Sequence, residues 1–211
     1  TTNLSTFGAG YPQVHIISNR GMTADLFRNP YHMQQLHAMG LQPETAYACA
    51  MSFLLAPHPH IQSRFAAAIR RLSDTAVLKI GIQIRTGDDT LKDQTEDDLD
   101  RYQAYFDCAQ QAQDTRQQGY PGGVVWLLVT DSHSVRKQAV QRYGSRVVLP
   151  SQEVKLAHLY EPTLRDHNTT SYEAATYSAG ENWLFGMTDV QIISNISGFG
   201  RTGAFRTKNP H

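Results

Sequence analysis

Residues 79–88 have the sequence KIGIQIRTGD, and this stretch decides the fold. Its first six residues form a short apolar run rich in isoleucine, which is typical of a strand buried on both faces of a parallel sheet. Arg85 follows the run directly, and a glycine turn and acidic residues follow the arginine. The stretch therefore predicts an interior strand that ends in a charged turn.

Four other apolar runs resemble this strand, namely VHIIS (14–18), VVWLLVT (124–130), RVVLP (146–150) and VQIIS (190–194). Apolar residues at helical spacing occur outside these runs, at 61–72, 99–112, 135–143 and 172–187. Alternating strands and helices predict an α/β fold with a Rossmann-like, doubly wound parallel sheet. We expect residues 1–40 to lead into this domain and residues 41–211 to form it.

The predicted helices carry recognisable ends. Thr95 with Asp98 resembles a capping box, Ser132 is a candidate N-cap and Gly144 a candidate stop. Asp131 ends the run 124–130 and opens the next helix, so it either binds a ligand hydroxyl or caps the helix. We favour the cap, because acidic residues are favourable at a helix N-terminus.

Composition excludes some classes of protein. Of 211 residues, 40% are hydrophobic and 18% charged, which predicts a globular core. Nineteen basic and nineteen acidic residues balance, so the basic excess of a nucleic-acid-binding protein is missing. No apolar run reaches the ~18 residues of a membrane span, and there is no signal peptide. The sequence lacks an initiator methionine, and we expect a fragment or a processed form.

Cys49 and Cys108 lie in apolar, helix-like stretches, which predicts that both are buried as small hydrophobic residues. A disulfide between them is left open. Sequons occur at Asn3, Asn168 and Asn195. Asn168 lies in a polar loop that could carry a glycan, whereas Asn195 is expected to be inaccessible.

Ligands of open α/β sheets bind beyond the carboxyl ends of the strands. Arg85 lies at such an end, where a guanidinium can hold a phosphate through two parallel charge-assisted bonds. The alternative is an arginine paired with Asp88 or Asp89. The run 190–194 leads into SNISGFGR (194–201), where Ser197, the turn N–H groups and Arg201 can surround a phosphate. Together the two strand ends predict a nucleotide-diphosphate site.

At these residues the sequence resembles the fucosyltransferases of the GT-B fold, most closely the plant cell-wall (xyloglucan) type. It is more distantly similar to the core α1,6 and rhizobial types. IGIQIRTGD (80–88), VVWLLVTD (124–131) and TDVQIISNISGFG (188–200) resemble the first, second and third motifs of that family, in the same order. The likeness covers about residues 40–205. It implies the C-terminal, donor-binding half of a GT-B fold, with much of the acceptor half missing.

The resemblance also implies a reaction and a set of residues. Fucose would pass from GDP-fucose to a glycan acceptor with inversion and without a metal, in the Golgi lumen, as in cell-wall biogenesis. Arg85 would hold the β-phosphate, Ser197 and Gly198 would contact the diphosphate, and Gln83 and Glu181 would lie at the guanine. Asp189 would hold the start of its strand rather than the ligand.

The likeness has departures and leaves the catalytic base open. Thr86 stands where several relatives carry a second arginine. Asp88 and Asp89 are candidates for a base by location, but an oxocarbenium-like transition state can rely on stabilisation of the leaving group instead. Asp88 is the candidate that we assign beside Arg85.

Other functions are weighed against these. His58-Pro59-His60 lacks further metal ligands, and Asp98-Leu99-Asp100 lies in an acidic run, 93–100, that we interpret as a solvated helix start. No metal is therefore expected. A non-catalytic domain that binds a sugar nucleotide or a glycan is the main alternative. A phosphoryl- or sulfuryl-transfer enzyme is disfavoured, because the P-loop pattern is missing.

Overall fold

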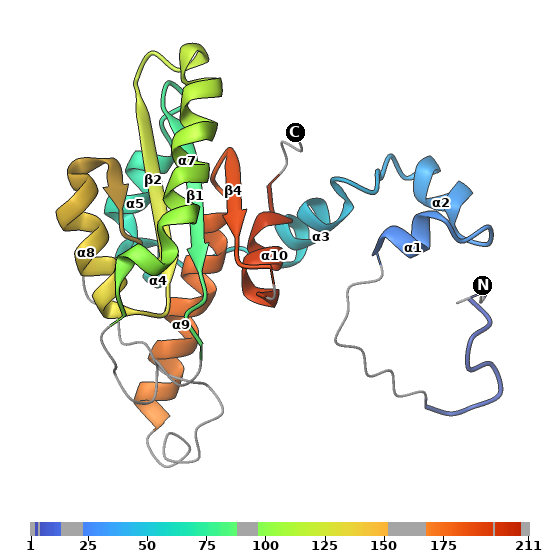
Figure 1. Ribbon diagram of the computed structural model, residues 1–211. Helices are drawn as coiled ribbons and strands as arrows, with labels where there is room; N and C mark the ends of the chain where they lie inside the picture. The colour runs from blue at the N-terminus through green and yellow to red at the C-terminus, as the bar shows by residue number, and fades with distance from the viewer. Residues whose placement is uncertain are drawn as a thin grey trace. The chain divides into compact units, whose positions relative to one another are not determined.

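The computed structural model describes residues 3, 5–13, 23–87, 97–151, 168–195 and 197–207 (Figure 1). These residues fall into two compact units, one that extends to Leu55 and a larger one from Ala56 to Thr207. The division thus comes later in the chain than the expected boundary at residue 40. Each unit is described by itself.

Among its described residues the smaller unit contains three short helices, α1 (Thr23–Phe27), α2 (Met33–Ala38) and α3 (Ala46–Leu54). The Phe27 ring packs edge-on against His37 with 5.8 Å between the ring centroids. Few of the side chains described in this unit are buried, and α3 ends with Phe53 and Leu54 exposed. The predicted strand at 14–18 lies outside the described residues.

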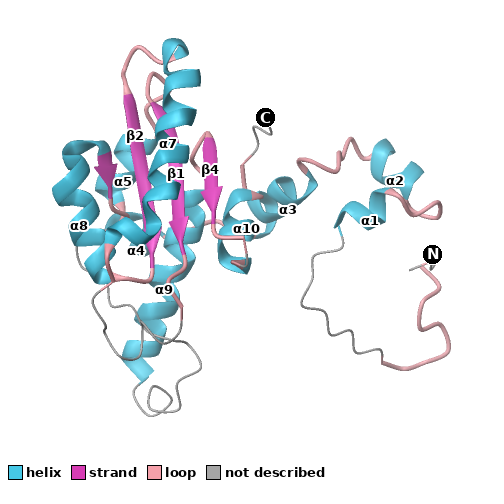
Figure 2. Ribbon diagram, in the orientation of Figure 1, coloured by secondary structure: helices cyan, strands magenta, loops and turns pink. Residues whose placement is uncertain are grey.

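The larger unit is built on a parallel sheet, as the sequence predicts (Figure 2). Among the described residues its strands are β1 (Leu78–Ile84), β2 (Val124–Thr130), β3 (Val147–Val148) and β4 (Val190–Ile193). Their order is β3-β2-β1-β4, and every pairing is parallel. β1 is central, with Ile82 opposite Leu128 of β2 and Ile192 of β4. The α/β, Rossmann-like fold is confirmed.

Helices cover both faces of the sheet. Successive side chains of a strand point to opposite faces, so the sheet contributes to two cores. Ile80, Ile82 and Ile84 pack in one core with α7 (Gln103–Arg116) and α8 (His133–Tyr143). The other core joins Leu127 to α5 (Ala66–Leu72) and α9 (Asn168–Phe185). Burial on both faces explains why the strands have apolar sequences without alternation.

The remaining helical elements are short. They are α4 (Pro59–Arg64), α10 (Gly198–Ala204) and the 3-10 turns η1 (Leu99–Tyr102), η2 (Gln117–Gly119) and η3 (Gly144–Arg146). The expected helix at 61–72 is divided between α4 and α5 at Phe65, whose ring is fully buried. The expected helix at 99–112 begins as η1.

Several predicted helix ends are confirmed. The Ser132 Oγ accepts a hydrogen bond from the Val135 N–H at 3.3 Å and caps α8. Gly144 follows α8 with a φ of 59°, a conformation that glycine adopts at little cost. The expected capping box differs, because Asp98 is itself the N-cap of η1 and accepts from the Asp100 N–H at 3.0 Å. Thr95 lies outside the described residues.

Two glycines permit close packing around β1 and α9. A Cβ at Gly81 would lie 2.7 Å from the Phe185 ring, and a Cβ at Gly180 would lie 2.1 Å from the Phe65 ring. Both rings are fully buried, so neither can move aside to make room for a Cβ. The core that joins Leu127 to α5 and α9 therefore depends on the absence of a side chain at both positions.

The prediction of buried cysteines is wrong. Cys49 and Cys108 are exposed and are free thiols. In α7 the buried positions are Phe106 and Ala109, which lie on one face, and Cys108 falls on another face of the same helix. An apolar surrounding sequence therefore does not by itself predict that a cysteine is buried.

No helix within the described ranges is long and apolar enough to cross a bilayer.

Candidate functional site at the carboxyl edge of the sheet

The chain order of the strands places a switch point beside β1. From β1 the chain builds β2 and β3 on one side and later adds β4 on the other side. The crossovers that leave on the two sides diverge there, and ligands of such sheets bind at this edge. Arg85, Asp131 and Ser194 follow β1, β2 and β4 respectively, so all three lie at the edge.

Arg85 is held to the end of β2 by Asp131. The Arg85 Nη1 donates to Asp131 Oδ2 in a close ion pair. The other oxygen of Asp131 accepts from Thr86, from its N–H at 2.8 Å and from its hydroxyl at 3.0 Å. The Arg85 side chain is 32% exposed and that of Asp131 is 11% exposed. The carboxylate thus orients an arginine that still reaches solvent.

Asp131 is not the helix cap that we favoured. Ser132 caps α8, and Asp131 binds the two residues that follow β1. The sequence places Asp131 and Arg85 forty-six positions apart, and only the pairing of β1 with β2 brings them together. Asp88 and Asp89, the alternative partners of Arg85 and the candidates for a base, lie outside the described residues.

Ser194 holds Arg85 from the opposite strand. The Arg85 N–H donates to the Ser194 Oγ at 3.0 Å, and this hydroxyl donates to the Gln83 carbonyl at 3.3 Å. The Tyr105 hydroxyl lies 2.9 Å from the same oxygen. A serine hydroxyl has a single hydrogen, so Tyr105 must be the donor in the last contact. The backbone of Arg85 is therefore fixed through β4 and α7.

Gln83, expected near the guanine, lies beneath this edge. Its side chain is 3% exposed, and its Oε1 accepts from the Ser194 N–H at 3.4 Å. A Cβ at Gly200 of α10 would approach the same oxygen to 2.4 Å, so Gln83 packs closely on the backbone of α10. In the structure Gln83 joins β1, β4 and α10.

Glu181, the other residue expected at the guanine, forms a buried ion pair with Arg136. The Glu181 Oε1 accepts from the Arg136 Nη2 at 2.8 Å, and both side chains are at most 7% exposed. Arg136 also donates from Nε and Nη2 to the Thr130 carbonyl, at 3.0 and 2.6 Å. Burial raises the pKa of Glu181, and Arg136 opposes that shift. The Arg136 Nη1 is buried without a hydrogen-bond partner.

The turn after β4 has the form that the sequence predicts. The Ser197 Oγ accepts from the Gly200 N–H at 3.0 Å and caps α10, and Gly198 begins that helix. A hydroxyl that accepts one bond retains its own hydrogen to donate. Arg201 is exposed and donates from Nη2 to the Asn195 carbonyl in a short contact. Asn195 itself is exposed, contrary to expectation.

Asp189 holds the start of β4 as expected. Its Oδ2 accepts from the Lys79 N–H at 2.9 Å and lies 3.2 Å from the Lys79 Nζ. The Asp189 N–H donates in turn to the Lys79 carbonyl at 2.8 Å. These contacts are at the amino end of the strands, opposite to Arg85, so Asp189 is a structural residue.

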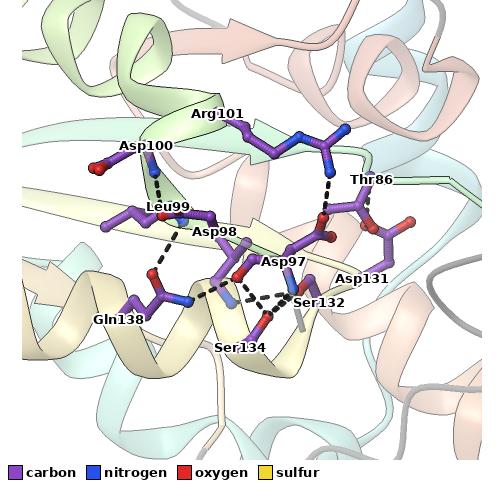
Figure 3. A network of polar contacts seen from close by, with 11 residues as sticks. Thr86, Asp97, Asp98, Leu99, Asp100, Arg101, Asp131, Ser132, Ser134 and Gln138 are labelled. Atoms are coloured by element: carbon purple, nitrogen blue, oxygen red, sulfur yellow. Dashed lines mark hydrogen bonds and ion pairs between the residues drawn. The ribbon is translucent and has the colours of Figure 1, made fainter. Parts of the chain in front are cut away.

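The structure adds Asp97, a residue that sequence reasoning did not select (Figure 3). Its N–H donates to the Ser134 Oγ at 2.9 Å, and its carbonyl accepts from the Ser134 hydroxyl at 3.1 Å and from the Gln138 Nε2 at 2.7 Å. Its Oδ1 pairs with Arg101 at 3.1 Å. The acidic run 93–100 is thus not solvated throughout, because Asp97 is 5% exposed.

Tyr102 lies next to these acidic residues. Burial raises the pKa of its hydroxyl, and the nearby carboxylates of Asp97 and Asp131 add to that effect. The phenol therefore remains a neutral hydrogen-bond donor at neutral pH. Nothing in the local sequence marks Asp97 as buried, because its neighbours Asp98 and Asp100 have the same charge.

The edge combines the Arg85 guanidinium, the Ser197 hydroxyl and the Asp131 carboxylate. A phosphate would meet Arg85 and Ser197, and hydroxyl groups would meet the carboxylates. No cluster of three or more histidine, cysteine or acidic side chains that could hold a metal occurs within the described ranges. No known protein family matches the sequence, and no curated protein matches it.

Proposed function

We propose that the larger unit binds a sugar nucleotide at the carboxyl edge of its sheet and is the donor-binding domain of a fucosyltransferase-like enzyme. The donor is GDP-fucose, the acceptor is a hydroxyl of a glycan, and the transfer inverts the sugar carbon without a metal. In this proposal the compartment is the Golgi lumen. The fold and the arrangement around Arg85 support it, together with the resemblance of the three motifs.

The position of Arg85 is the observation that carries the proposal. It follows the central strand, beside the switch point, and it is held in place by Asp131 on one side and by Ser194 on the other. A departing GDP gains negative charge at its β-phosphate, and a fixed cation stabilises that charge without reorganisation. A guanidinium presents its N–H donors in a planar fork, which is the geometry that matches a phosphate.

Ser197 would add a hydrogen bond to the diphosphate from the neighbouring strand end. Its hydroxyl is fixed by its contact with Gly200, and it lies in the turn that follows β4. The roles of Gln83 and Glu181 at the guanine, and of Arg201 at the diphosphate, remain parts of the proposal. Because the first two side chains are engaged within the fold, a guanine would have to contact their exposed neighbours or displace their present partners.

Isothermal titration of the chain with GDP in the presence of EDTA tests the proposal. We compare the unmodified protein with Arg85→Ala and with Arg116→Ala. Arg116 ends α7 just before the start of β2, at the opposite edge of the sheet, so the control removes the same charge far from the site. Loss of a hydrogen-bonded charge should weaken binding about 10- to 100-fold in Arg85→Ala alone.

Three results would contradict the proposal. The unmodified chain could fail to bind GDP, Arg85→Ala could bind it equally well, or the two variants could lose affinity equally. A parallel titration with UDP tests the base. Equal affinity for UDP and GDP would refute guanine recognition while leaving diphosphate binding intact.

A further inference from the structure

Asp97 has a carboxylate oxygen that the fold leaves without a partner. Its Oδ2 is buried and has no hydrogen-bond partner of normal geometry. The Oδ1 of the same carboxylate pairs with Arg101, and the Tyr102 hydroxyl also interacts with the carboxylate. A buried acceptor without a donor costs its full desolvation penalty, and a charged acceptor costs more. Such a group calls for an explanation, and a role in catalysis is one of those known.

The residue is held firmly in one position. Three hydrogen bonds connect its backbone to Ser134 and Gln138 of α8. Gln138 also accepts from the Leu99 N–H at 3.0 Å, which fixes the chain two residues later. A carboxylate that is fixed in this way loses little entropy when a ligand donates to it.

Asp97 lies in the same corner as the residues around Arg85. The Ser134 Oγ, which binds the Asp97 backbone, is 3.0 Å from the Ser132 Oγ, and Ser132 directly follows Asp131. Figure 3 shows the Asp97 carboxylate on the side that faces Thr86 and Asp131. The backbone of Asp97 is thus connected through Ser134 to Ser132, the residue that follows the Asp131 carboxylate that orients Arg85.

We propose that Asp97 is the general base of the transfer, an inference that rests on the proposed function. The acceptor hydroxyl gives its proton to Asp97 Oδ2 while its oxygen forms a bond to the anomeric carbon. The bond from that carbon to the β-phosphate oxygen breaks, and the electron pair leaves with GDP. Arg85 stabilises the charge on the departing diphosphate. The proton stays on Asp97 until the products leave, and it then passes to solvent.

In this proposal the acceptor hydroxyl reaches Asp97 by displacing Arg101, which pairs with the Oδ1 of the carboxylate. The Arg101 side chain is 71% exposed, whereas that of Asp97 is 5% exposed. An incoming hydroxyl therefore displaces a flexible surface guanidinium and not a core residue. Asp97 is a carboxylate of the described chain, and it takes the role for which the sequence suggested Asp88 or Asp89.

The experiment measures release of fucose from GDP-fucose with water as the acceptor, because water needs the same base. Asp97→Asn removes the base and keeps the shape. Asp100→Asn is the matched control, since Asp100 lies three residues later, is 69% exposed and pairs with Arg142 at the surface. The affinity for GDP-fucose is measured in parallel by titration, and rates are expressed per folded molecule from circular dichroism.

We expect Asp97→Asn to release fucose at least about 100-fold more slowly while its affinity for GDP-fucose changes less than about threefold. Asp100→Asn should behave like the unmodified chain. Asp97→Glu, which keeps a proton acceptor, should recover part of the rate, and an equal loss in Glu and Asn variants would indicate a structural role and overturn the assignment.

The remaining outcomes separate this inference from the function on which it rests. If the unmodified chain binds GDP-fucose and releases fucose, and Asp97→Asn releases it at the same rate, Asp97 is not the base and the donor site stands. If the unmodified chain does not bind GDP-fucose at all, the proposed function is refuted and the assignment of the base falls with it.

Discussion

The buried pair of Arg136 and Glu181 gives the sharpest prediction about stability. Glu181→Ala removes the only carboxylate that pairs with Arg136 among the described contacts and leaves the guanidinium buried, with its Nη1 already unpaired. Removing one partner of a buried ion pair typically costs about 3–5 kcal/mol. Arg136 is 4% exposed and cannot reach water without moving away from the Thr130 carbonyl. We therefore expect Glu181→Ala to lower the free energy of unfolding by about 3–5 kcal/mol.

Urea unfolding followed by circular dichroism measures that cost. For a unit of this size, 3–5 kcal/mol corresponds to a fall of roughly 6–20 °C in the melting temperature. The double variant Arg136→Met with Glu181→Leu should recover most of the loss, because apolar residues of similar volume replace buried ion pairs at little cost. A loss below about 1 kcal/mol in Glu181→Ala would refute the reasoning that the pair is buried and coupled.

The same pair of variants tests the role of Glu181 at the guanine. If Glu181 is only the partner of Arg136, the folded double variant keeps the preference for GDP over UDP. If Glu181 contacts the base, the double variant loses that preference although it folds. The stability and the specificity of the double variant are thus separate measurements.

Two further predictions concern the edge of the sheet and its pH dependence. Tyr105→Phe removes the donor to Ser194, so the free energy of unfolding should fall by about 1 kcal/mol and GDP binding should weaken by a few-fold. The control is Tyr143→Phe, which removes a hydroxyl that contacts Gln103 at 3.3 Å and should leave GDP binding unchanged in the same titration. Partial desolvation and, to a smaller extent, the charge of Arg136 lower the pKa of His133 below its ordinary value of 6.5, although His133 is exposed, so the effect on stability should be small. The unfolded chain therefore binds a proton near pH 6 that the folded protein does not, so the free energy of unfolding decreases as the pH falls below 6.5. The urea midpoints of His133→Gln should depend less on pH between 7 and 5 than those of the unmodified chain. An equal pH dependence in both proteins would show that His133 does not contribute.

Much of the fold could be predicted from local sequence. The strand at 124–130 agrees with β2 at both ends, and the Ser132 cap and the Gly144 stop of α8 were predicted from single residues. These features depend on hydrophobic runs and on backbone preferences of individual residues, which act over a few positions. β3 is shorter than expected, because only Val147 and Val148 pair with β2.

The site could be predicted only in outline. The position of Arg85 at a strand end follows from the sequence, but its partner Asp131 does not, because the ion pair depends on which strands are neighbours. Glu181 is a polar residue in a helix, and its burial against Arg136 depends on how α9 packs on the sheet. Asp97 resembles its acidic neighbours in sequence and differs from them only in burial.

The strand order has a consequence for synthesis of the chain. β1 pairs with β4 across about 110 residues, and the contact of Lys79 with Asp189 spans that distance. Until β4 has left the ribosome, one edge of β1 presents unpaired N–H and C=O groups, and such edges invite pairing with other chains. Contacts between distant residues also slow folding. Release of the chain before residue 193 would therefore leave β1 as an exposed apolar edge, and a chaperone that shields it would be needed most during this interval.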